Sequence, residues 1–79
     1  MKTRFKVYAF NRNAYPVENT EVESLTATHA LARAKVRLLP NPKIDAFSVF
    51  DAVTKRLVLT ATRNRETPTS CFQITHVRT

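Results

Sequence analysis

The chain has 79 residues, a formal net charge of +7 and no glycine, while 43% of its residues are hydrophobic. This length allows one domain over residues 1–79, near the lower limit for a core without disulfides or metal, and the hydrophobic content argues against a disordered tail. The lack of glycine argues against Gly-rich phosphate loops and glycine-dependent tight turns. The positive charge favours an anionic partner, nucleic acid or an acidic protein surface, although it also serves solubility alone.

The first predicted element is a strand over residues 2–10, which alternates almost without a fault. Phe5, Val7 and Ala9 fall on one side, as expected of a half-buried strand. The opposite side would form a basic outer face with one aromatic ring: Lys2, Arg4, Lys6 and Tyr8. A loop or wide turn over residues 11–16 follows, because the segment is rich in asparagine and ends at a proline.

A short second strand with Val17, Thr20 and Val22 is expected to run antiparallel to the first. The same segment contains three of the chain's six acidic residues: Glu18, Glu21 and Glu23. If the two strands are neighbours, these carboxylates can pair with Lys2, Arg4 or Lys6. Such pairs would lower the positive potential of the basic face.

The strongest predicted element is a helix over residues 24–39. Thr26 is a suitable N-cap because its hydroxyl can accept from the free amide groups of the first turn, and Pro40 provides the stop. Arg33 and Arg37 share one face, four residues apart. The opposite face is small and apolar and consists of Ala27, Ala30, Leu31, Ala34 and Leu38. We expect this face to lie against a sheet.

Three more strands are predicted after the helix. Residues 44–50 are apolar on both sides, which is typical of a central strand. A hairpin loop over residues 51–55 leads to a strand over residues 56–63, with Leu57, Leu59 and Ala61 inward and Val58, Thr60 and Thr62 on the other side. A polar loop with Arg63 and Arg65 precedes an edge strand over residues 71–77. The expected fold is α+β, an antiparallel ββαβββ sheet with one helix packed on one face.

The sequence contains few residues suited to catalysis or metal binding. Cys71, His29 and His76 are all the zinc-ligating sulfur and nitrogen side chains that it has, so we expect no metal site and no cofactor. Nucleophilic catalysis needs a base near an activated serine, threonine or cysteine, and no known catalytic motif supplies this arrangement for either histidine, so we expect a protein that is not an enzyme. The single cysteine cannot form an internal disulfide, and no apolar run approaches ~20 residues, so a cytoplasmic protein is expected.

Binding is the remaining class of function. Cations can contact phosphates and a tyrosine ring can stack on a base. The candidate residues for a partner or nucleic acid are Lys2, Arg4, Lys6, Tyr8, Arg33, Arg37, Arg63 and Arg65. If the helix and the outer strand face lie on opposite sides of the sheet, they form two weak patches and not one. No RNP aromatic motif, GXXG loop, zinc finger or helix-turn-helix spacing is present.

Three segments resemble small phage-encoded anti-CRISPR proteins of type I systems: Glu21-Val22-Glu23-Ser24-Leu25-Thr26 leading into the alanine-rich basic helix, Phe47-Ser48-Val49-Phe50-Asp51, and Lys55-Arg56-Leu57-Val58-Leu59. The resemblance covers about half the chain and carries over no contact residue. It implies a non-enzymatic inhibitor that docks on a host ribonucleoprotein, such as a crRNA-guided surveillance complex, and blocks target DNA. Because this chain is basic, it would bind an acidic protein patch or hold nucleic acid unproductively, and would not mimic DNA.

Three alternatives therefore follow from the sequence. The first is a phage or mobile-element inhibitor that occludes a host nucleic-acid machine, working in the cytoplasm of the host cell without a membrane partner. The second is a protein that binds DNA or RNA directly through its basic surface. The third is a subunit of a larger assembly, or a homodimer, that pairs through an exposed sheet edge.

Overall fold

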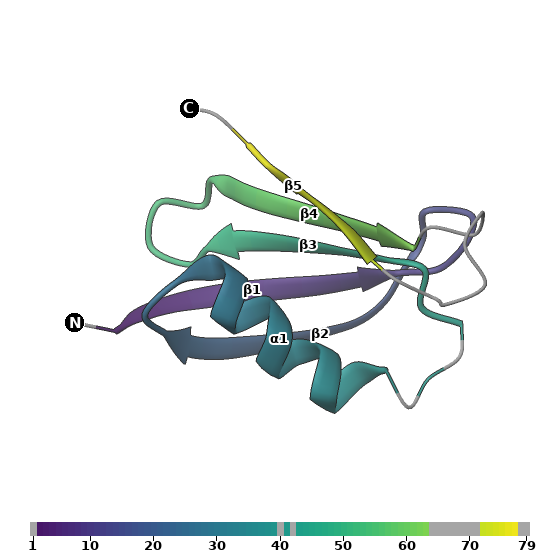
Figure 1. Ribbon diagram of the computed structural model, residues 1–79, viewed down its shortest axis with the longest axis horizontal. Coiled ribbons are helices and arrows are strands. Elements are labelled where there is room, and N and C mark those ends of the chain that lie inside the picture. The colour runs from purple at the N-terminus through teal and green to yellow at the C-terminus, as the bar shows by residue number, and fades with distance from the viewer. Residues whose placement is uncertain (1, 40, 42, 64–71, 78–79) are drawn as a thin grey trace.

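One antiparallel sheet and one helix make up the described part of the fold. The computed structural model describes residues 2–39, 41, 43–63 and 72–77. Its elements are β1 (Thr3–Phe10), β2 (Pro16–Ser24), α1 (Ala27–Leu38), β3 (Ala46–Asp51), β4 (Leu57–Arg63) and β5 (Phe72–His76). The strands lie in the order β2-β1-β3-β4-β5, and α1 packs across one face of the sheet (Figure 1). The predicted α+β class and ββαβββ order are confirmed.

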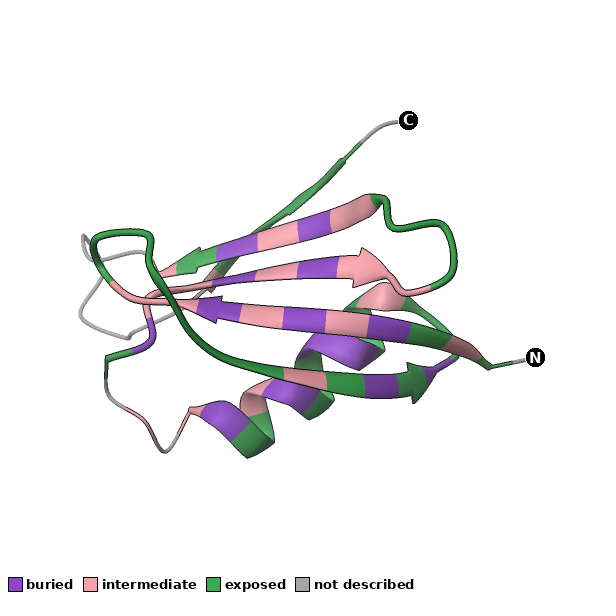
Figure 2. Ribbon diagram, turned by 180° about the vertical axis from the view of Figure 1, so that it is seen from behind, coloured by how far each residue is buried: buried purple, intermediate pink, exposed green. Residues whose placement is uncertain are grey.

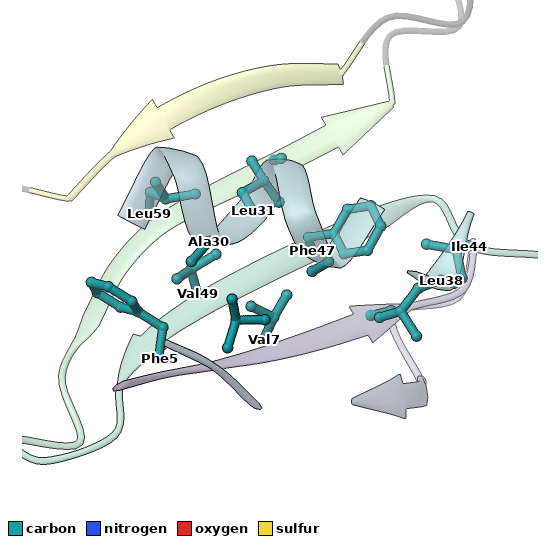
Figure 3. Close-up of a cluster of buried hydrophobic side chains, with 13 residues drawn as sticks. Phe5, Val7, Ala30, Leu31, Leu38, Ile44, Phe47, Val49 and Leu59 are labelled. Atoms are coloured by element: carbon teal, nitrogen blue, oxygen red, sulfur yellow. The ribbon is translucent and has the colours of Figure 1, made fainter. Parts of the chain in front are cut away.

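The core lies between α1 and the sheet face that it covers (Figure 3). The helix contributes Ala30, Leu31, Ala34 and Leu38, as its periodicity predicts. The strands contribute the inward-facing residues Phe5, Val7, Ala9, Val22, Phe47, Val49, Leu59 and Ala61, and Ile44 precedes β3. Burial of each large apolar side chain stabilises the fold by roughly 1.5–3 kcal/mol. The small alanines allow α1 to lie close to the sheet.

The two ends of α1 follow from local sequence. The Thr26 hydroxyl accepts from the His29 backbone N–H at 3.1 Å, which satisfies one free donor of the first turn and confirms the predicted N-cap. The helix ends at Leu38, and the Leu39 N–H donates to the Lys35 carbonyl at 2.9 Å. It is therefore shorter than the predicted range at both ends.

Two differences from the predicted strands arise from pairing. β2 is nine residues long, and Thr20 and Val22 face inward while Val17 is exposed. In β4, Leu59 opposes Val49 whereas Leu57 opposes Phe50, so Val58 is an extra residue at a β-bulge. Val58 packs against the core, and Leu57 shares the opposite face with Phe50. The predicted orientations of Leu57 and Val58 are therefore wrong.

Two hairpin turns use left-handed residues without glycine. Ala14 and Lys55 both have a φ of 64°. Each turn begins at a residue whose side-chain oxygen binds backbone amides, Asn11 at 2.9 and 3.0 Å and Asp51 at 2.8 and 3.2 Å. The expectation that a chain without glycine avoids such turns is wrong, because these side chains hold the backbone in place.

Replacing Ala14 with glycine is expected to stabilise the protein by about 0.5–1 kcal/mol, because glycine has no Cβ to clash at positive φ. Ala32→Gly is the matched control at an exposed position of α1, where the same change is expected to cost about 1 kcal/mol. Chemical denaturation measures the free energy of unfolding of both variants. Destabilisation by Ala14→Gly would show that this turn is not strained.

Candidate functional site

The face of the sheet opposite α1 is the candidate functional surface, and Figure 2 shows the molecule from this side. Because Phe5, Val7 and Ala9 point toward α1, the alternate residues of β1 point away from it. These are Arg4, Lys6, Tyr8 and Phe10, and Lys2 precedes them in the chain. The register of β3 places Phe50 opposite Lys6. We call this surface the helix-free face.

Aromatic rings occupy the centre of the helix-free face. The ring centroids of Tyr8 and Phe50 are 5.6 Å apart with an interplanar angle of 88°, an edge-to-face pair. Both side chains are only partly buried. An open hollow of about 670 Å³ lies over them and is lined by Lys6, Tyr8, Phe10, Pro16, Glu21, Phe50, Asp51, Ala52 and Lys55. The neighbouring strands β1 and β3 thus place two aromatic rings beside the lysines that line the hollow.

Two predicted ion pairs are present on this face. Arg4 Nη2 lies 3.4 Å from Glu23 Oε1, and Lys6 Nζ lies 4.0 Å from Glu21 Oε1. The Arg4 and Glu23 side chains are more than half exposed, so the pair contributes little to stability. The pairs reduce the positive potential along β1, as the sequence suggests.

Lys2 and Lys55 add positive charge at one end of the helix-free face. The Ala52 N–H donates to the Arg4 carbonyl at 3.0 Å, which holds the β3–β4 hairpin beside the start of β1. Lys2, Arg4 and Lys55 consequently line one hollow together. Neither lysine has an ion-pair partner among the described residues. Their charges are available to an anionic ligand.

Arg33 and Arg37 lie on the other side of the sheet, with α1. Arg33 Nη1 donates to the Glu23 carbonyl at 3.1 Å, and Arg37 Nη1 donates to the Thr20 hydroxyl at 3.3 Å. Both side chains therefore reach from the helix to β2 and link the two elements. The predicted residues do not form one basic surface, since the helix and β1 present their cations on opposite faces.

Arg63 is the last residue of β4, where it contributes to folding contacts. Its Nε lies 3.4 Å from Asp45 Oδ1, and its Nη2 donates to the Ile44 carbonyl at 3.1 Å. Its guanidinium also lies 4.9 Å from the centroid of the Phe72 ring, within range of a cation–π contact. Arg63 therefore joins the segment before β3 to β4 and β5. Arg65 lies outside the described residues.

One hydrogen-bonded pair of side chains was not predicted from the sequence. The Ser24 hydroxyl and His29 Nδ1 share a hydrogen bond of 2.7 Å, although no motif suggested a histidine beside a serine. Ser24 is only 2% exposed, so the hydrogen bond satisfies a buried hydroxyl. The pair lies between the end of β2 and the first turn of α1, next to the Thr26 cap. The hydrogen bond therefore links the end of β2 to the start of α1.

Phe10, Phe50 and Lys55 line the central hollow but were not among the site residues predicted from the sequence. A signal for Phe50 existed, because a central strand that is apolar on both sides must place one side away from a single helix. Lys55 gave no signal, since its position depends on how the hairpin lies against β1. The pairing of β3 with β1 thus brings Phe50 and Lys55 to the helix-free face.

The described part of the chain has neither a metal-binding cluster nor a membrane-spanning helix. Within residues 2–39, 41, 43–63 and 72–77, no three His, Cys, Asp or Glu side chains are grouped in a way that could hold a metal ion. No helix formed by these residues is long and apolar enough to cross a membrane. No protein-family model, curated protein or solved structure matches this chain.

Proposed function

We propose that this protein binds nucleic acid through the helix-free face, as a non-enzymatic protein of the cytoplasm. The observation that carries the proposal is the grouping of cations with partly exposed rings on one sheet surface. Lys2 and Lys55 have no ion-pair partner among the described residues, and they lie beside the hollow over Tyr8 and Phe50. Phosphates bind such cations, and every base can stack on a ring.

The net charge of +7 supports the same ligand. A field of this sign attracts a phosphate backbone and accelerates encounter with it. The acidic residues near the site are engaged: Glu21 and Glu23 pair with Lys6 and Arg4, and one oxygen of Asp51 accepts from the amides of its own turn. Their charge is therefore partly compensated within the protein.

Fluorescence anisotropy with labelled single-stranded DNA, duplex DNA and RNA tests the proposal across a salt titration. The logarithm of the affinity is expected to fall linearly with the logarithm of the salt concentration. A slope of about −3 corresponds to roughly four phosphate contacts on a single strand. Lack of binding to all three ligands at about 50 mM salt would refute nucleic-acid binding by this protein.

A second candidate is the phage inhibitor that docks on a host ribonucleoprotein and blocks nucleic-acid access. The observation that favours it is the row of carboxylates on β2 beside the rings, because Glu21 and Glu23 make the helix-free face mixed in charge. Mixed charge around an apolar centre suits a protein partner. Binding to such a complex is expected to depend weakly on salt, whereas binding to phosphates depends strongly on it.

A further inference from the structure

We propose that the ligand of the helix-free face is an extended single strand of nucleic acid that runs along β1. Its bases stack on the aromatic rings at the centre, and its phosphates contact cations at both ends of the strand. This inference rests on the proposed function and specifies its ligand. Three observations support it: a row of hollows that share lining residues, partly exposed rings and a weakly held lysine.

Neighbouring hollows of the helix-free face share lining residues, and we call the three hollows together the track. The central hollow shares Glu21, Ala52 and Lys55 with the hollow at the start of β1, and it shares Phe10 with a third hollow beside the loop after β1. Arg12 lines that third hollow and has no ion-pair partner among the described residues. Cations therefore lie at both ends of β1, which spans about 26 Å at ~3.3 Å per residue.

The rings favour unpaired bases. Tyr8 and Phe50 lie in the middle of the track, between the cations of its two ends. A duplex keeps its base faces stacked inside, so it would present sugar and phosphate to these rings. A single strand can place a base face on a ring, and such stacking tolerates any sequence. The aromatic centre would thus add affinity only for a single strand.

Lys6 is poised to contact a phosphate. Its Nζ lies 5.8 Å from the centroid of the Tyr8 ring and 4.0 Å from Glu21 Oε1. Both distances are near the outer limits of cation–π and ion-pair contacts. A base that stacks on Tyr8 can displace the ammonium group from the ring, and Lys6 then lies between the bound strand and Glu21.

The test compares an oligothymidylate, an abasic strand of equal length and the matching duplex by anisotropy at fixed salt. The oligothymidylate is expected to bind about tenfold more tightly than the abasic strand. Tyr8→Leu should remove most of this difference while retaining apolar volume, and Phe50→Leu is the second variant. Tyr15→Leu is the matched control, since Tyr15 is 67% exposed in the loop after β1 and lines none of the three hollows.

The outcomes separate this inference from the proposed function. Equal affinity for the oligothymidylate and the abasic strand, or tighter binding of the duplex, would overturn base stacking but leave nucleic-acid binding intact. Failure of all three ligands to bind would overturn both. An equal loss of affinity in Tyr15→Leu and Tyr8→Leu would also overturn the assignment of the rings. Thermal unfolding of each variant confirms that the fold is present.

Discussion

Replacing Leu31 with aspartate is expected to unfold the protein. Leu31 is 1% exposed and faces the sheet from the middle of α1. The substitution removes a buried side chain, at a cost of about 2–5 kcal/mol, and places a carboxylate where water cannot reach it. A domain of this size has a total stability of only about 4–12 kcal/mol. Far-UV circular dichroism should show loss of the helix and sheet signals.

Leu25→Asp is the matched control for this prediction. Leu25 precedes α1 and is 66% exposed, so the same change there removes little buried surface. The new carboxylate would also lie near the helix N-terminus, where negative charge is favourable by about 0.3–1 kcal/mol. A folded Leu31→Asp protein, or equal destabilisation by both variants, would show that α1 presents a different face to the sheet.

The fold could largely be predicted because its elements have clear periods. Alternation in β1 and the three-and-four spacing in α1 each identify a buried face, and the structure confirms both. Thr26 marks the helix start through a local hydrogen bond that depends on adjacent residues alone. Such local features need no knowledge of which strands are neighbours.

Features that depend on pairing could not be predicted. The bulge at Val58 arises because Phe50 opposes Leu57, and nothing in the sequence of β4 itself signals that register. Ala14 and Lys55 adopt positive φ because the side chains of Asn11 and Asp51 hold their turns. The general rule that such turns need glycine was overridden by these hydrogen bonds.

The candidate site was predictable in part for the same reason. Arg4, Lys6 and Tyr8 share a face by alternation along one strand, and the structure places them on the helix-free face. Long side chains are different, since Arg33 and Arg63 reach back to carbonyls of other elements. The number of lysines and arginines in the sequence is therefore larger than the number that a ligand could contact. Which of them stay available depends on how the strands pair.

The largest effect on binding is expected from reversing the two lysines at the start of the track. Lys2→Glu/Lys55→Glu should weaken nucleic-acid binding about a hundredfold and reduce the salt slope by about 1.5, because two phosphate contacts are lost and replaced by repulsions. Arg33→Glu/Arg37→Glu is the matched control, with the same change in net charge on the side of the sheet that α1 covers. The measurement is the anisotropy titration against single-stranded DNA.

The two double variants distinguish binding at the helix-free face from a general attraction by the net charge. If the net charge alone attracts the ligand, both doubles lose affinity equally, since the long-range field does not distinguish the faces. If the helix-free face is the site, the lysine double loses far more than the arginine double. The arginine double should still fold, because Arg33 and Arg37 are exposed and each loses one hydrogen bond worth about 0.5–1.5 kcal/mol. Equal losses would therefore remove the helix-free face as the binding site and leave only a diffuse electrostatic attraction.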